Sequence, residues 1–526
     1  MNRKYLPFGY TVAHLALLLT LVLETSALAQ SVTALEAAPT DGNTTRSGEW
    51  LETHHPEYLL LQRQVNLIPQ AEAKPALSIA LIPNEFDLID GNAAVQYMQA
   101  LAFAEQQNAL EQMREFQRKS QREVEAAGKD TSQVEPSVWL ETAPSDLPVE
   151  RVREYLSYSS WQTRYLDEAI KRRECNFDRN IRAVKNPMGF LLPEIQALRE
   201  VSRTQSMRFR LAIAEDRTQD AVHIFAQQLA LGHHLDQEVF LVSNLVGIAC
   251  ASIGARDAFY LSESVTAPNL YWAIAALPQP LVSMRRASAY EREFAFEQFR
   301  QFREVDAVPL PASYWQRFVA KLAQDTEGWS GVDLRWPMGI EAPAGQALLI
   351  GAAYPGAKLF LIEELDMDPA AVEALPVTQV VFLAVRRLYE QVRDEAFKIQ
   401  YLPSPQRVGF SPDQALEIAN DKYGWINGLG ELFLPAMGSA LSAGERLQQQ
   451  LALLQTIEAL RDHMAGHDGR LPEQLSELRL PAPNDPVTQQ PFEYAYEAGR
   501  AKLSGAVVSR IKYELVLAPA AEGDSP

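Results

Sequence analysis

Residues 239–255 constrain the fold most strongly, because no charged side chain occurs among them. Small residues recur at every fourth position, so on a helix they form one smooth stripe against which another helix backbone can lie closely. A helix that is apolar on all sides is buried in a core or in a membrane. This one is slightly short for a membrane span and contains Asn244 and Ser252, so we expect a buried core helix and no membrane span in the mature chain. The small residues of the stripe are Ser243, Gly247, Ala251 and Ala255.

The chain of 526 residues has a formal net charge of −19. This excess of acidic side chains opposes a nucleic-acid partner, because affinity for phosphate backbones depends on Lys and Arg. It also provides no attraction to anionic lipid. Hydrophobic residues make up 47% of the chain, which is enough to bury a large core.

The N-terminus has the three-part pattern of a secretory signal peptide. Arg3 and Lys4 precede an apolar run, and Ala27 and Ala29 supply the small side chains of a cleavage site. The apolar run is too short to span a bilayer. We therefore expect export to the periplasm or beyond, with cleavage before Gln30. The alternative is an uncleaved N-terminal segment that anchors the chain in the membrane.

The chain has two cysteines, Cys175 and Cys250. An exported protein could join them in a disulfide. Cys250 lies in the apolar stretch, where a small buried thiol is the plainer interpretation, and Cys175 follows a charged run. Pairing needs a geometry that a sequence does not contain, so it stays open here.

Helical patterns fill most of the chain, which predicts a mostly α fold. We expect an irregular array of helical hairpins, tetratricopeptide-repeat (TPR)-like in part, with a small C-terminal antiparallel β hairpin or sheet. The TPR-like part is residues 193–231, where Ala221 and Phe225 follow a turn at Asp216, although no regular repeat period occurs. A long helical pattern at 442–463 precedes the predicted strands. The expected divisions are a signal peptide (1–29), a flexible leader (30–48), an N-terminal helical region (49–175), a central helical-hairpin domain (176–440), a long helix with an α/β end (441–518) and a disordered tail (519–526).

Four aromatic residues recur at spacings of three or four within residues 148–173, which we expect to form one helix. Such a stripe packs on a neighbouring helix in most cores. The alternative is a stacking platform, a binding groove for a sugar or a peptide. The four residues are Tyr155, Tyr158, Trp161 and Tyr165.

Two sets of histidines are the candidates for binding a metal. His463 and His467 are four residues apart, so on a helix both rings point the same way. They stand at the predicted end of that helix, where cations also suit the helix dipole. Neither set has a confirming ligand pattern, so we expect no metal. The second set is His223, His233 and His234.

Motifs of known chemistry do not occur in the sequence. It contains no nucleophile elbow, phosphate loop, zinc-protease motif, Cys-x-x-Cys pair, calcium loop or dinucleotide motif. We therefore expect no cofactor, assign no catalytic residue, and favour a function other than catalysis.

Several segments resemble a family of exported helical proteins that is abundant in planctomycete-type genomes. The resemblance implies export and a helical fold over most of the mature chain. It implies no activity, so it assigns no catalytic residue. The segments are DGNAAVQYMQAL (90–101), REC-NF around Cys175, and residues 198–232, 267–287, 352–381, 467–478 and 484–499.

The C-terminal part is similar to the globular end of the major pseudopilins of type II secretion. Those proteins share a G-x-x-P-x-x-L-x-x-L helix, a D-P turn and an aromatic strand. The N-terminal assembly helix and the acidic calcium loop of pseudopilins are missing here, so the resemblance implies a shared module and no pilus subunit. The matching residues are Gly469, Pro472, Leu475, Leu478, Asp485, Pro486, Phe492 and Tyr494.

These features together favour a non-catalytic exported helical protein of the cell envelope, with grooves between helical hairpins that bind a protein or peptide partner. Two alternatives remain. One is an enzyme, hydrolase-like, whose site is assembled only in three dimensions. The other is an accessory component of a secretion or envelope assembly.

Overall fold

The structure is a computed structural model in which the chain forms two compact units. Of the described residues, the larger unit comprises those within 44–178, 192–286 and 442–520, and the smaller comprises 179–180 and those within 287–441. The predicted signal peptide lies outside the described residues. The structure describes residues 44–47, 49–106, 108–130, 134–180, 192–326, 343–407, 412–423, 426–427, 434 and 437–520.

A six-stranded sheet brings the two ends of the described chain together in the larger unit. Its order is β1-β2-β3-β8-β7-β6, and all neighbours are antiparallel except β3 and β8, which run parallel. The strands are β1 (Thr44–Ser47), β2 (Trp50–His54), β3 (Leu59–Leu67), β6 (Glu493–Glu497), β7 (Arg500–Ser504) and β8 (Ile511–Pro519).

The prediction of a mostly helical fold with antiparallel strands at the C-terminal end is confirmed. The three N-terminal strands were not predicted, and β1 lies inside the stretch that we expected to be a flexible leader. Alternate side chains of β3 and β8 are buried, including Val65 and Leu515, which are fully covered. The buried side chains of these strands pack in one hydrophobic core with apolar side chains of the long C-terminal helix. Successive side chains of a strand point to opposite faces of a sheet, so this alternation means that the sheet buries one face.

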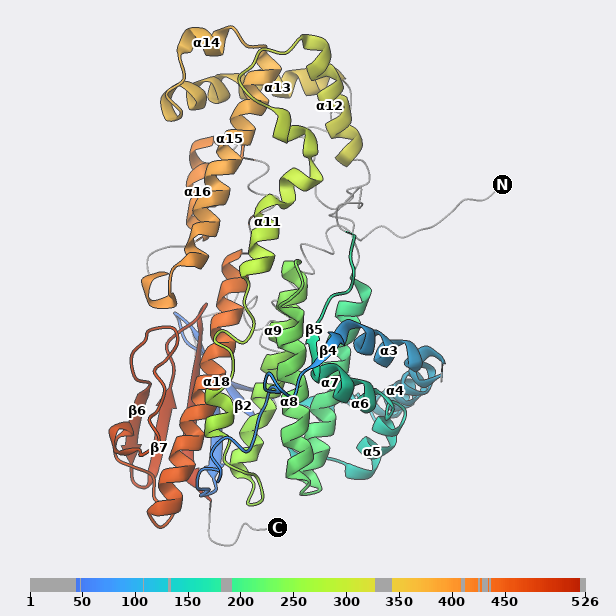
Figure 1. Cartoon of the computed structure of the whole chain (residues 1–526), viewed down its shortest axis with the longest axis vertical. Coiled ribbons are helices and arrows are strands. Elements are labelled where there is room, and N and C mark those ends of the chain that lie inside the picture. Colours follow the sequence, from blue (N-terminus) through green and yellow to red (C-terminus); the bar gives the residue numbers. More distant parts are fainter. Residues whose placement is uncertain are drawn as a thin grey trace. The chain divides into compact units, whose positions relative to one another are not determined.

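Helices make up the rest of the larger unit, and α7, α8 and α9 lie side by side in it (Figure 1). The predicted hairpin is confirmed as α7 and α8, and Asp216 in its turn has a positive φ of 55°, the conformation that glycine often supplies. The helices are α3 (Ala93–Gln106), α4 (Ala109–Ala126), α5 (Val149–Ser157), α6 (Gln162–Ile170), α7 (Pro193–Ala214), α8 (Thr218–Leu235), α9 (Leu241–Ala258), α10 (Tyr271–Ala275) and, from Ser442 on, α18 (Met437–Gly466), with short 3-10 turns η2 (Ser137–Leu140), η3 (Pro144–Asp146), η6 (Phe259–Glu263) and η11 (Leu475–Glu477) and a two-stranded sheet of β4 (Ile89–Asn92) and β5 (Arg172–Glu174).

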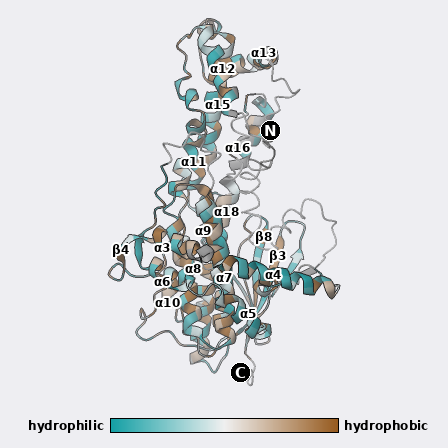
Figure 2. Ribbon diagram, turned by 90° about the vertical axis from the view of Figure 1, so that its right-hand side faces the viewer, coloured by the Kyte–Doolittle hydropathy of each residue, from teal (hydrophilic) through white to brown (hydrophobic). Residues whose placement is uncertain are grey.

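Helix α9 is the predicted apolar helix, and most of its side chains are buried. Among the described helices, the segment Leu241–Glu263 is long and apolar enough to cross a membrane by length and composition, but 83% of its most apolar window is buried inside the protein. By contrast α4 is largely hydrophilic (Figure 2). Burial in a protein core, as expected from the sequence, accounts for the apolar character of α9.

The smaller unit is helical in its described part. Its aromatic core includes Phe302, Phe318 and Phe382, whose rings lie within about 6 Å of one another. The buried Gln379 side chain donates to the carbonyls of Asp306 and Val308, and these bonds hold the loop that precedes α12. The elements are α11 (Arg285–Gln298, in this unit from Ala287), η7 (Arg300–Glu304), α12 (Ala312–Thr326), α13 (Pro343–Leu359), η8 (Phe360–Glu364), α14 (Pro369–Glu373), α15 (Val377–Lys398), η9 (Ile399–Tyr401), η10 (Ser404–Arg407) and α16 (Pro412–Tyr423).

Candidate functional site

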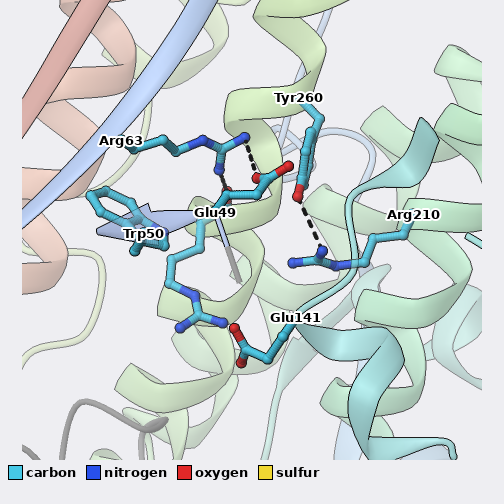
Figure 3. A pocket seen from close by; sticks show the side chains of 7 residues that line it. Glu49, Trp50, Arg63, Glu141, Arg210 and Tyr260 are labelled. Carbon is cyan, nitrogen blue, oxygen red and sulfur yellow. Dashed lines mark hydrogen bonds and ion pairs between the residues drawn. The ribbon is translucent and has the colours of Figure 1, made fainter. Parts of the chain in front are cut away.

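A small polar cleft lies in the larger unit, where residues of β2, β3, α7, α9 and η6 meet (Figure 3). Its volume is about 240 Å³ with the open mouth included. Segments far apart in the sequence supply its walls. The lining residues, called the arginine cleft below, are Glu49, Trp50, Arg63, Glu141, Arg210, Arg256 and Tyr260.

Arg63 enters the cleft from β3. It occupies an inward position of the strand, as do Leu61 and Val65 two residues before and after it. Only 3% of its side chain is exposed. Its guanidinium lies over the ring of Tyr260, 4.4 Å from the centroid, and donates through Nη1 to the carbonyl of Arg256 at 3.2 Å. Nη2 forms ion pairs with Glu49 at 3.0 Å and Glu263 at 3.5 Å. Burial raises the pKa of Glu263, and the nearby Arg63 opposes this rise.

Arg210 enters the cleft from α7 and forms a buried ion pair with Asp257 of α9, with Nη2 and Oδ1 3.1 Å apart. Its Nη1 also donates to the hydroxyl of Tyr260 at 3.1 Å (Figure 3). The same nitrogen donates to the carbonyl of Thr142 at 2.6 Å. Burial raises the pKa of Asp257, and the Arg210 charge limits that rise. Burial likewise raises the pKa of Tyr260, so its hydroxyl stays protonated.

The charges of the arginine cleft are compensated within the protein. Its three arginines face two lining carboxylates, Glu49 and Glu141, and two more behind them, Glu263 and Asp257. Guanidinium groups stay protonated and cannot act as bases. This arrangement can fix β3, η6 and α7 to one another through buried ion pairs and hydrogen bonds.

The aromatic stripe does not lie on one helix. The predicted helix at 148–173 is divided into α5 and α6 by a turn at 158–161 and ends in β5. Tyr155 is buried against Phe116 and Trp139, at centroid distances of 5.3 and 5.8 Å. Tyr158 packs on the same core, and Trp161 and Tyr165 are half-buried on the turn and on α6. These contacts favour packing over a stacking platform.

The first histidine pair lies at the end of α18, as expected. The rings of His463 and His467 are stacked 3.8 Å apart, and Nδ1 of His467 lies 2.7 Å from the carbonyl oxygen of His463. Burial lowers the pKa of His463, and the neighbouring His467 lowers it further. Among the described residues no group of three or more His, Cys, Asp and Glu is placed to hold a metal ion.

The second set of histidines is not brought together. Nε2 of His223 lies 2.6 Å from Oδ1 of Asp167, and this hydrogen bond raises the pKa of His223. Nδ1 of His233 lies 3.1 Å from the carbonyl oxygen of Leu281. His234 is buried elsewhere, so each of the three rings has its own partner and none points at a common centre.

His234 forms a buried bridge between α8, α3 and β5. Its Nδ1 lies 2.8 Å from the hydroxyl of Tyr97, and its Nε2 lies 3.0 Å from the carbonyl oxygen of Arg172. Burial lowers its pKa to about 4, so the ring is neutral at physiological pH. A neutral ring accepts a hydrogen bond from the Tyr97 hydroxyl at Nδ1 and donates one from Nε2 to the carbonyl, which satisfies both contacts. The two cysteines, Cys175 and Cys250, are also buried, and they are free thiols.

Four large apolar side chains that the sequence analysis did not single out are exposed within one short stretch, which runs from just before β4 into the N-terminal half of α3. The inner face of α3 is buried, whereas Val95 and Met98 on its outer face are 51% and 44% exposed. Ile89 of β4 is 46% exposed, and Phe86 just before it is 99% exposed. We call these four residues the α3 outer surface. The sequence contained one signal for this surface, because α3 has apolar residues on both of its faces. A helix that buries one face needs apolar residues on that face only.

No family model, curated protein or solved structure matches this chain.

Proposed function

We propose that this chain is an exported, non-catalytic protein of the cell envelope that binds a protein or peptide partner. The observation that carries this proposal is the α3 outer surface. Single exposed apolar side chains are ordinary, but several within one short stretch favour an interaction site, because partner binding removes them from water. The buried inner face of α3 holds the surface on a packed helix, which reduces the ordering that binding requires.

The arginine cleft supports a structural role rather than a catalytic one. Arg63 and Arg210 are engaged with carboxylates, a hydroxyl and carbonyl oxygens of the same chain. Burial raises the pKa of Tyr260 in the cleft and the pKa values of Asp257 and Glu263 behind it.

A second candidate function is an accessory role in a secretion or envelope assembly. The observation that favours it is the order of α18, η11 and the antiparallel strands β6 to β8, since the pseudopilin-like residues lie between the end of α18 and the middle of β6. Asp485 accepts hydrogen bonds from Gln449 of α18 and from the backbone of Ala506, so the D-P turn is tied to both the helix and the sheet. Normal secretion in a strain that lacks the gene would remove this candidate.

The experiment that tests the proposed function is crosslinking in the native envelope with mass spectrometry of the captured proteins. A reproducible set of envelope proteins supports a binding role, and secretion components among them support the second candidate. If well-exported protein captures nothing, the enzymatic alternative takes precedence and thermal-shift screens of metals and small molecules follow. N-terminal sequencing of the exported protein tests the signal peptide, with Gln30 as the expected first residue.

A further inference from the structure

Strand β6 forms one edge of the six-stranded sheet. Only β7 pairs with it among the described residues. The other neighbouring position of β6 is not filled by any described strand. An unfilled edge presents backbone donors and acceptors on which another strand can form hydrogen bonds.

The register of β6 and β7 identifies the backbone groups that face outward. Their hairpin closes through Ala498 and Gly499, which have positive φ angles of 48° and 82°, as a two-residue turn with left-handed residues requires. Glu497 and Arg500 are the partners that flank this turn, so they form a hydrogen-bonded pair. From there along the hairpin, hydrogen-bonded and non-hydrogen-bonded pairs alternate. Tyr494 and Tyr496 therefore occupy non-hydrogen-bonded positions, and their N–H and C=O groups point away from β7.

We propose that β6 is a docking site for an extended, basic peptide segment of the partner, which adds to the sheet as a further strand beside β6. This inference rests on the proposed function and deepens it, because it names the edge and the class of peptide. Strand addition obtains its affinity from main-chain hydrogen bonds and its selectivity from alternate side chains.

The side chains of β6 select for a basic segment. Glu493, Ala495 and Glu497 lie on the exposed, polar face of the strand. Glu493 already accepts from Lys512 at 2.8 Å but stays 74% exposed, and Glu497 is exposed too. A neighbouring strand places its side chains directly opposite these glutamates, so Lys or Arg residues four positions apart would pair with both.

The same charges disfavour a second copy of this chain as the occupant. A two-fold antiparallel pairing of β6 with β6 of another copy, centred on Ala495, would place Glu493 opposite Glu497 twice. Like charges that face each other across strands destabilise the pairing. In this register the edge disfavours its own copy while it favours a basic partner.

The test titrates the full mature chain with a short peptide of alternating lysine and valine residues, and with a matched peptide of alternating glutamate and valine. We expect the lysine peptide to bind and the glutamate peptide not to bind. Tyr496→Pro should weaken binding about tenfold, because proline removes an outward N–H while leaving the bonds between β6 and β7 in place. Tyr496→Val keeps the N–H and should bind within about twofold of the unaltered chain.

A charge-reversed chain, Glu493→Lys with Glu497→Lys, gives a second test that does not depend on how proline is tolerated. It should prefer the glutamate peptide. Equal binding of the lysine peptide by Tyr496→Pro and the unaltered chain would overturn the proposal, because it would show attraction by net charge alone. No binding by the unaltered chain would overturn it as well. If crosslinking captures the same partners with Tyr496→Pro, the edge inference fails while the binding function stands.

Discussion

The backbones of Gly232 on α8 and Gly247 on α9 approach so closely that neither residue has room for a side chain. A Cβ added to Gly232 would lie 2.8 Å from the carbonyl oxygen of Gly247, and a Cβ added to Gly247 would lie 2.9 Å from that of Gly232. The small-residue stripe of α9 thus performs the role expected from its sequence. It brings two buried helices to backbone contact at the centre of the larger unit.

Gly247→Ala should therefore destabilise the larger unit. The methyl group meets backbone atoms that cannot rotate away, and we expect the free energy of unfolding to fall by about 1–3 kcal/mol. Gly351→Ala in α13 is the matched control, because no atom lies within 4 Å of the added Cβ. That change should stabilise its helix by about 0.5–1 kcal/mol. Urea unfolding measures both, and an unchanged transition for Gly247→Ala would contradict the close approach.

Sequence patterns were sufficient where one local segment determines the structure. The uncharged stretch predicted α9, and the helical pattern at 193–231 predicted the hairpin of α7 and α8. Strand β3 was missed because Leu59, Leu60 and Leu61 are three consecutive leucines, which hide the period-two alternation that follows them. Its partner β8 lies more than 400 residues away along the chain, and no local pattern specifies such a pairing.

The arginine cleft could not be predicted for the same physical reason. Arg63, Arg210 and Tyr260 come from three distant segments, and each looks like an ordinary residue of its own strand, helix or turn. Their relation exists only after β3 packs on η6 and α7. The division of the aromatic stripe was also hidden, because spacings of three and four persist across the turn at 158–161 that separates α5 from α6.

Removing one partner of the Arg210–Asp257 ion pair should be costly. Asp257→Ala leaves the Arg210 guanidinium buried without its carboxylate, and we expect a loss of about 3–5 kcal/mol in the free energy of unfolding. The double variant Arg210→Met with Asp257→Leu should lose less than the sum of its two single changes, because no unpaired charge remains. Chemical denaturation of the unaltered chain, Arg210→Met, Asp257→Leu and the double variant gives the coupling energy of the pair. Strict additivity would show that the two groups do not interact.

His234 should make stability fall at mildly acidic pH. Its pKa is about 4 when folded against an ordinary value of 6.5, so the unfolded chain takes up the proton first as the pH falls. The stability that the neutral ring contributes is fully present above pH 6.5. It is lost as the pH falls from 6.5 to about 4, and the free energy of unfolding falls by about 3 kcal/mol in all. Other ionisable groups also contribute to the pH dependence of stability, so the readout is the difference in pH dependence between the unaltered chain and His234→Gln. Parallel curves would contradict the assignment.

His223 should show the opposite shift. Its hydrogen bond to Asp167 raises its pKa, so this contact contributes stability at low pH and the contribution is lost as the pH rises through the raised value. NMR titration of the His223 ring should give a pKa above the ordinary range, and Asp167→Asn should lower it. A pKa of His223 that does not respond to Asp167→Asn would show that the pair does not form in solution.

The most direct test of partner binding compares crosslinked proteins from three chains in the native envelope. Val95→Glu with Met98→Glu places charge on the α3 outer surface, and Leu77→Glu with Val265→Glu changes two positions elsewhere that are at least as exposed. The proposal predicts that the unaltered chain and the control capture the same reproducible proteins, and that the α3 variant loses them at least about tenfold. Capture of the same set by the α3 variant, at equal export and stability, would contradict the central claim.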